Sequence, residues 1–231
     1  TTIINTLTCN ATINTTTLLL ANLTTNSSNS NCLTIDANNV TIDCQGFYLF
    51  GSRQGGQTGI MASGYNSTTI RNCNVYNFST GIAIMGTSSY IIFNNIELNT
   101  VADFGPSGSN GISITNTLNS TIFNNTIKNA IIGQAMTGNG ISISSSENNN
   151  ISFNFIRNTT GTSSGADILL SSSGNNTIHD NTIQGAGYRT ISLEGGIGRN
   201  LFFNNNFSSS GSVSISSGNN SWNNSVIGNR W

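Results

Sequence analysis

The stretch GISITNTLNSTIFNNTIKN, residues 111–129, contains three short apolar segments separated by polar turns. An apolar-x-apolar triplet comes first, and a polar turn, a second apolar residue, an Asn pair and a third apolar residue follow it. Similar copies begin at Gly59, Gly140 and Asp167. Alternation over such short segments, interrupted by Gly, Asn and Ser, is typical of strands and turns. The stretch therefore predicts three strands per repeat and no helix.

The opening triplet recurs along the chain, and successive copies start 22 to 30 residues apart. Eight copies align, at Leu33/Ile35, Ile60/Ala62, Ile82/Ile84, Ile112/Ile114, Ile141/Ile143, Ile168/Leu170, Ile191/Leu193 and Val213/Ile215. Strands this short become stable when the chain coils and each pairs in parallel with its equivalent one turn away. Equivalent side chains then stack at about 4.8 Å. We therefore predict an all-β, single-domain β-solenoid of about eight turns over 33–231, preceded by an N-terminal strand and cap segment over 1–32.

Two stretches, CLTIDANNVTIDCQGFYLFGS at 32–52 and GYNSTTIRNCNVYNFSTGI at 64–82, resemble the right-handed parallel β-helix repeat proteins of the pectin-lyase-like superfamily. They are especially similar to β-helix domains of archaeal exported surface proteins. The resemblance covers about 33–231 and implies a right-handed coil. Because this fold carries lyases, hydrolases, metal-handling proteins, adhesins and fibres, the resemblance does not fix the function.

The composition is unusual for a soluble protein. Only 6% of the 231 residues are charged, against about 25% in an average protein, and Asn, Ser and Thr dominate instead. A net charge of −1 gives no field that would attract nucleic acid or an anionic membrane. The apolar runs are too short to span a bilayer. The chain opens on Thr1, which we interpret as a mature exported chain after leader removal.

An Asn column follows the middle strand. Three residues after each middle apolar residue come Gln45, Cys73 and then Asn95, Asn125, Asn154, Asn181, Asn205 and Asn224. In a coil these amides would stack and donate to one another as a ladder. The alternative is that Asn simply favours turns. One copy departs from the pattern at Glu97, where a one-residue bulge would restore the alternation.

Four cysteines, Cys9, Cys32, Cys44 and Cys73, all lie in the first third of the chain. In an exported protein they predict two disulfides among three pairings. We favour Cys44 with Cys73, because Ile42 and Ile70 are equivalent and place these two on adjacent turns, and Cys9 with Cys32. Free buried thiols are the alternative.

Fifteen Asn begin an N-x-Ser/Thr sequon, a number close to chance for this composition. Their positions are more informative than their number. Five of them fall in the turn before the middle strand, where a glycan would point to solvent: Asn39, Asn66, Asn119, Asn175 and Asn219. We expect several of these to carry N-glycans.

Catalytic residues are sparse. As the resemblance implies, pectate lyases use an Asp cluster for calcium and a basic residue, and related hydrolases use neighbouring Asp carboxylates. Calcium takes six to eight oxygens and acid–base hydrolysis takes two carboxylates roughly 5–9.5 Å apart. The best constellation here is Asp167, His179, Asp180, Arg189 and Glu194, although Asp180 also fits a turn position. One His and three Met do not suit copper or zinc. We predict no catalytic residue, metal or cofactor, and no enzyme.

The ends and one outward column suggest contact with other molecules. Residues 1–14 alternate as one long strand that could cap its own coil or a neighbour's, and the last turn stops at Trp231 without a covering helix. Aromatics follow the middle apolar residues and could form a partner surface or a sugar-stacking platform. The interface candidates are Ile3, Leu7, Phe93, Phe123, Phe203, Trp222 and Trp231.

These features lead to one main functional prediction and one alternative. The main prediction is an extracellular structural protein, a filament or sheath subunit that stacks head to tail. The alternative is a polysaccharide-binding or polysaccharide-degrading β-helix, or a surface adhesin.

Overall fold

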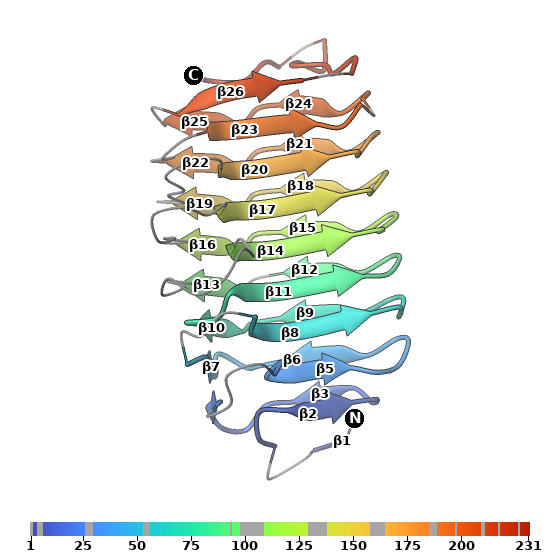
Figure 1. Cartoon of the computed structure of the whole chain (residues 1–231), viewed down its shortest axis with the longest axis vertical. Coiled ribbons are helices and arrows are strands. Elements are labelled where there is room, and N and C mark those ends of the chain that lie inside the picture. Colours follow the sequence, from blue (N-terminus) through green and yellow to red (C-terminus); the bar gives the residue numbers. More distant parts are fainter. Residues whose placement is uncertain are drawn as a thin grey trace.

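The computed structural model describes residues 2–3, 7–25, 30–52, 56–92, 94–97, 109–128, 138–157, 165–184, 189–196, 198–208, 211–216, 218–225 and 227–231. Within these ranges the regular structure consists of short strands and contains no helix, so none that could cross a membrane. The strands form three parallel sheets, and the chain winds through them as a solenoid whose termini lie at opposite ends (Figure 1). One passage through the three sheets is called a rung below.

Sheet 1 contains the opening triplet of each repeat and has nine strands in the described part of the chain: β2 (Ala11–Ile13), β5 (Leu33–Ile35), β8 (Thr58–Ser63), β11 (Thr80–Met85), β14 (Ser109–Thr115), β17 (Gly138–Ser144), β20 (Ala166–Ser171), β23 (Arg189–Glu194) and β26 (Ser212–Ile215). All eight aligned triplets lie in these strands.

Sheet 2 contains the middle strand of each rung: β1 (Thr2–Ile3), β3 (Thr17–Leu18), β6 (Thr41–Asp43), β9 (Thr69–Arg71), β12 (Tyr90–Ile92), β15 (Thr121–Phe123), β18 (Asn150–Ser152), β21 (Thr177–His179) and β24 (Leu201–Phe203). Sheet 3 contains the third strand: β4 (Leu23–Thr24), β7 (Tyr48–Phe50), β10 (Asn74–Tyr76), β13 (Asn95–Glu97), β16 (Thr126–Lys128), β19 (Phe155–Arg157), β22 (Thr182–Gln184) and β25 (Asn206–Ser208).

The core is a set of inward columns of like residues. In sheet 1, Ile112, Ile141 and Ile168 are register partners on successive rungs, and all three are fully buried. Sheets 2 and 3 carry equivalent isoleucine columns. Each buried isoleucine contributes roughly 1.5–3 kcal/mol by removing its side chain from water. The predicted stacking of equivalent columns therefore accounts for the core.

The N-terminal segment departs from the prediction. Residues 1–14 do not form one long strand, because β1 lies in sheet 2 and β2 lies in sheet 1. Strands β2, β3 and β4 pair with β5, β6 and β7 respectively. Residues 11–24 thus add a rung below the first one predicted. Leu7, a predicted interface residue, is partly buried and packs against the core.

The disulfides hold adjacent rungs together at this end. Cys9 is bonded to Cys32, and Cys44 is bonded to Cys73, which is the favoured pairing. No cysteine is free.

The register between sheets 2 and 3 differs from the prediction at one rung. Ile91, not Ile92, is the inward residue of β12, since it pairs with Ile70 and Ile122. Strand β13 pairs residue by residue with β10 and β16, so the bulge predicted at Glu97 is absent. Three consecutive apolar residues had hidden the register, and a shift of one residue reverses the face of every side chain.

An Asn ladder is present at the turn between sheets 2 and 3, with two of its six predicted members corrected. It consists of Asn94, Asn125, Asn154, Asn181, Asn205 and Asn229. The amide oxygen of Asn94 accepts from the Cys73 backbone, and each later amide oxygen accepts from the backbone and side chain of the Asn on the preceding rung. Asn95 follows the ladder position and begins β13, because of the register shift. The last member of the ladder is Asn229 and not the predicted Asn224, because the last rung does not keep the spacing of the others.

A second ladder lies at the turn between sheets 1 and 2. Its members are Asn149, Asn176, Asn200 and Asn220. The backbone and side-chain nitrogens of each of the first three donate hydrogen bonds to the amide oxygen of the Asn on the next rung. This second ladder was not predicted from the sequence. Both ladders satisfy buried polar groups at turns that would otherwise leave them unpaired.

The C-terminal rung is covered by aromatic rings. Trp222 stacks on the buried Phe202 at 4.6 Å between ring centroids, and Trp231 stacks on Phe207 at 4.5 Å. Trp222 therefore does not stand in the outward column where the sequence placed it. The two indoles shield the end of the core, although Trp231 stays 68% exposed.

Candidate functional site

A hollow of about 210 Å³ lies on the outer face of sheet 1 toward the C-terminal end. Its lining residues come mostly from β17, β20 and β23, which are consecutive strands of sheet 1 (Figure 1). Its lining consists of Asn139, Gly165, Ala166, Leu169, Arg189, Ser192 and Glu194. Along one column Asn139 is paired with Ala166 and Ala166 with Arg189. The small Ala166 side chain leaves room between its two larger neighbours.

One wall of the hollow is a charged cluster on β23. Arg189 Nη1 lies 3.1 Å from Glu194 Oε1 and 3.1 Å from Ser192 Oγ, and Ser192 Oγ donates to Glu194 Oε1 at 2.9 Å. Where β23 pairs with β26, its register shifts between Arg189 and Ile191. Such a bulge re-aims a side chain, and here Arg189 reaches the same face as Ser192 and Glu194.

The opposite wall and the floor are less polar. Asn139 is held in place, because its Oδ1 accepts from the Ala166 backbone and its Nδ2 donates to Asn110 Oδ1. Leu169 and Ala166 supply apolar surface between the walls. The hollow therefore offers a cation, a carboxylate, a hydroxyl and an amide around an apolar floor. This combination suits a polar, uncharged ligand with both hydroxyl and C–H surfaces.

The structure separates the constellation that the sequence suggested. Arg189 and Glu194 meet in the hollow, whereas His179 and Asp180 pair with each other at sheet 2. Asp167 belongs to β20 but is fully buried and does not line the hollow. Burial raises the pKa of Asp167 to about 9, so this carboxyl is protonated at neutral pH.

Five of the seven lining residues were missed by sequence reasoning, and three of them, Asn139, Leu169 and Ser192, present side chains larger than a methyl group to the hollow. Their strand positions could be aligned from the repeat, since Asn139 precedes the triplet of β17 and Leu169 and Ser192 are the middle residues of the triplets of β20 and β23. What the alignment did not show was that the Ala166 side chain leaves a gap. In the described residues, no group of three or more His, Cys, Asp and Glu side chains is placed to hold a metal ion.

The predicted surface residues have mixed outcomes. Phe123 and Phe203 stand on the outer face of sheet 2 and are partly exposed. Phe93 and the side chain of Ile3 lie outside the described residues. The five sequon residues Asn39, Asn66, Asn119, Asn175 and Asn219 are all exposed. Asn39, Asn119 and Asn175 adopt left-handed backbone conformations, which also favour Asn at a turn.

Comparison with protein families gives one match. Residues 58–231 match a family model described as a right handed beta helix region. The match covers most of the chain and fixes the hand of the coil. No curated protein matches the sequence.

Several solved structures share the fold at low sequence identity. DFA-IIIase from Arthrobacter chlorophenolicus A6 is 15% identical with a TM-score of 0.57, covering 77% of this chain and 41% of its own. The enzymatically active domain of bacteriophage CBA120 tailspike protein 2 is 14% identical with a TM-score of 0.58, and the match covers 89% of this chain and 40% of that protein. The periplasmic alginate epimerase AlgG is 15% identical with a TM-score of 0.50, and the match covers 87% of this chain and 50% of the epimerase.

These comparisons correct the main functional prediction. A filament subunit without enzymatic activity was expected, but the similar structures are enzymes. They favour the alternative prediction of a β-helix that acts on polysaccharides. The chain spans half or less of the length of these structures, and identities of this size establish the shared fold alone.

Proposed function

The chain belongs to the right-handed β-helix family, and we propose that within this fold it binds and modifies a carbohydrate chain at the hollow on sheet 1. The observation that carries the proposal is the Arg189–Ser192–Glu194 cluster beside an apolar floor. The enzymes with a similar fold, one of them named for alginate, support the choice of substrate class.

The hollow fits one sugar unit. Its volume of about 210 Å³ is below the ~300 Å³ at which sites for drug-sized ligands begin. Vicinal hydroxyls would accept from Arg189 and donate to Glu194, while an apolar C–H face would pack on Leu169. The rest of a polymer would continue across the exposed outer face of the sheet.

Glu194 is the group in the hollow that can move a proton. Its side chain is 45% exposed, against 24% for Arg189, so a bound sugar can reach it. A positioned carboxylate acting as general acid or base typically accelerates a reaction by 10²–10⁴-fold. Arg189 and Ser192 hold the carboxylate in place, and the guanidinium can stabilise negative charge that develops on the sugar.

A glycan panel tests the proposal. Purified protein is incubated with pectin, alginate, laminarin and xylan, and proton NMR records cleavage, new double bonds and epimerised units together. We expect at least one glycan to change. Glu194→Gln keeps a hydrogen-bonding side chain but removes the ionisable group, so turnover should fall at least ~100-fold while binding stays within a few-fold. Glu147→Gln, away from the hollow, serves as the matched control. An unchanged panel, or full activity in Glu194→Gln, would contradict the proposal.

The proposed substrate and the two disulfides support a location outside the cytoplasm, since disulfides persist in oxidising compartments. We extend the proposal to N-glycans on the exposed Asn39, Asn66, Asn119, Asn175 and Asn219, which would add polar surface to a weakly charged protein. The intact mass of native material should exceed the 24.3 kDa of the bare chain. Peptide mapping after deglycosylation assigns the sites, and a native mass equal to that of the bare chain would exclude glycans.

A further inference from the structure

A line of aromatic rings runs along the outer face of sheet 2, separate from the hollow on sheet 1. It consists of Phe123, Phe153, His179 and Phe203, called the ring line below. Ring centroids are 5.4 Å apart between Phe123 and Phe153, 6.1 Å between Phe153 and His179, and 4.9 Å between His179 and Phe203. The four rings come from four consecutive rungs, so the line follows the solenoid axis.

Phe153 keeps the ring line continuous, although its backbone adopts an unfavourable conformation. The outward column of sheet 2 contains Phe123, Ser152, His179 and Phe203, and the small Ser152 would break it. The ring of Phe153, the next residue, lies between Phe123 and His179 instead. Its φ of 57° is left-handed, a conformation that costs a bulky residue free energy.

Other rungs place short polar residues at this strained position. Asn124, Asp180 and Asn204 have φ values of 51°, 54° and 52° there, as expected for residues that tolerate left-handed backbone. Phe153 nevertheless remains 51% exposed, so core packing does not account for it. An exposed aromatic ring in a strained conformation points to a binding role.

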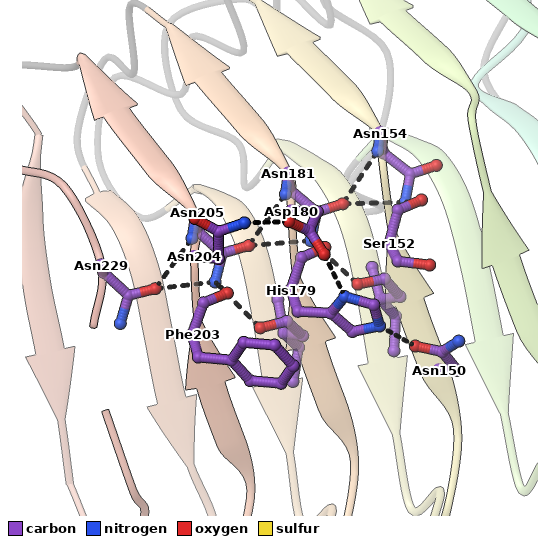
Figure 2. Close-up of polar contacts among 12 residues, drawn as sticks. Asn150, Ser152, Asn154, His179, Asp180, Asn181, Phe203, Asn204, Asn205 and Asn229 are labelled. Atoms are coloured by element: carbon purple, nitrogen blue, oxygen red, sulfur yellow. Dashed lines mark hydrogen bonds and ion pairs between the residues drawn. The ribbon is translucent and has the colours of Figure 1, made fainter. Parts of the chain in front are cut away.

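Polar groups fix and border the line (Figure 2). His179 Nδ1 lies 2.6 Å from Asp180 Oδ2, and its Nε2 lies 3.0 Å from Asn150 Oδ1. Asn204 hydrogen-bonds to Asp180. The imidazole is thereby held parallel to the ring of Phe203, at an interplanar angle of 1°. The result is an apolar track with hydrogen-bonding side chains beside it, in which the ring of Phe153 stands at 62° to Phe123 and at 80° to His179.

We propose that the ring line is a binding surface for a neutral polysaccharide chain lying along the solenoid axis. The apolar C–H groups of sugar rings pack on the exposed surfaces of the aromatic rings, above all on Phe153, because aromatic faces are electron-rich, and the sugar hydroxyls bond to Asn204, Asp180 and Asn150. The ionisable groups of the line, His179 and Asp180, pair with each other. Farther along the same column Arg71 pairs with Asp43, so the described part of the track presents no unpaired cation that would attract an anionic polymer. The inference rests on the proposed function only in expecting a carbohydrate ligand.

Affinity electrophoresis in gels that contain dextran, laminarin, galactomannan or hydroxyethyl cellulose tests the proposal, with alginate as the anionic comparison. Wild-type protein should be retarded by at least one neutral polymer. Phe153→Asn, which installs the residue found on neighbouring rungs, and Phe203→Thr should each weaken that binding about tenfold. Tyr48→Thr removes an exposed ring from sheet 3 and should leave it within twofold. Circular dichroism confirms that each variant folds.

Three outcomes would overturn the proposal: no retardation in any neutral gel, retardation in alginate alone, or unchanged binding in Phe153→Asn. Its failure can be told from failure of the proposed function. Phe153→Asn should retain turnover of short soluble oligosaccharides at the hollow, and Glu194→Gln should retain binding to the neutral gels. If the wild-type protein turns over no glycan but is retarded, the ring line stands and the proposed function does not.

Discussion

Asp167 shows how one buried side chain makes the stability of the fold depend on pH. Burial raises its pKa from the usual 3.8 to about 9, so the folded protein keeps a proton that the unfolded chain releases. Between these two values the folded state binds more protons than the unfolded state. The free energy of unfolding therefore falls as pH rises through this window, by at most about 1.4 kcal/mol per pH unit.

Asp167→Asn should remove this dependence, because the amide has a similar shape and does not ionise. We expect urea unfolding to give similar stabilities for the two proteins near pH 4. At pH 7.5 the Asn variant should be more stable by more than about 1.4 kcal/mol. Parallel stability profiles between pH 4 and pH 8 would show that Asp167 ionises freely in the folded protein.

The ladders show how single residues combine into an element. Asn181 Oδ1 accepts from the Asn154 backbone and side chain at 2.9 and 3.0 Å, while its Nδ2 donates to the Ile151 carbonyl and to Asn205 Oδ1 (Figure 2). Asn181→Ala would leave several buried groups unpaired, so we expect a loss of about 3 kcal/mol in unfolding free energy. Chemical denaturation measures it. Asn14→Ala, at an exposed position, should change stability by less than ~0.5 kcal/mol, and an equally small effect at Asn181 would refute the ladder's role.

Some glycines of sheet 1 are required because the neighbouring rung leaves no space for a side chain. A Cβ added to Gly111 would lie 2.5 Å from Ile127 Cγ2 and 2.7 Å from the Gly140 carbonyl oxygen. Because the carbonyl belongs to the paired backbone of the next rung, it cannot move cheaply. Gly111→Ala should cost about 1–3 kcal/mol, measured as a lower denaturation midpoint. Gly228→Ala meets nothing within 4 Å and serves as the control, so equal effects at both sites would mean that crowding is unimportant.

The same elements show how much the sequence can predict. Ladder members Asn125, Asn154, Asn181 and Asn205 follow from uniform spacing after an inward isoleucine or phenylalanine. Asn94 was misplaced because Ile91, Ile92 and Phe93 are all apolar, and period-two reasoning cannot choose among them. The second ladder has an equally regular position, two residues before each middle inward residue, and could have been found. The hollow could not, since it depends on the size of Ala166 between two neighbouring rungs.

At the scale of the whole molecule, stability is distributed unevenly along the axis. Repeat proteins gain most of their stability from contacts between neighbouring rungs. Both disulfides lie near the N-terminal end, closing sequence separations of 23 and 29 residues, and each restricts the unfolded chain by about 3–4 kcal/mol in the chain-entropy model. The C-terminal rungs depend instead on aromatic stacking over Phe202 and Phe207. Opening should therefore begin at the C-terminal end.

Hydrogen exchange in Trp222→Ala tests whether stability decreases toward the C-terminal end. Removing the indole exposes the ring of Phe202 and weakens the last rungs, so amides in β24 and β26 should exchange at least ~10-fold faster. Amides in β6 and β9, beside the Cys44–Cys73 disulfide, should keep their wild-type rates, because nearest-neighbour coupling decays along the coil. Trp231→Ala, which removes a more exposed ring, should have a smaller effect at the same strands. Uniform acceleration along the chain would instead mean that the solenoid unfolds as a single cooperative unit and that the aromatic cover stabilises all rungs alike.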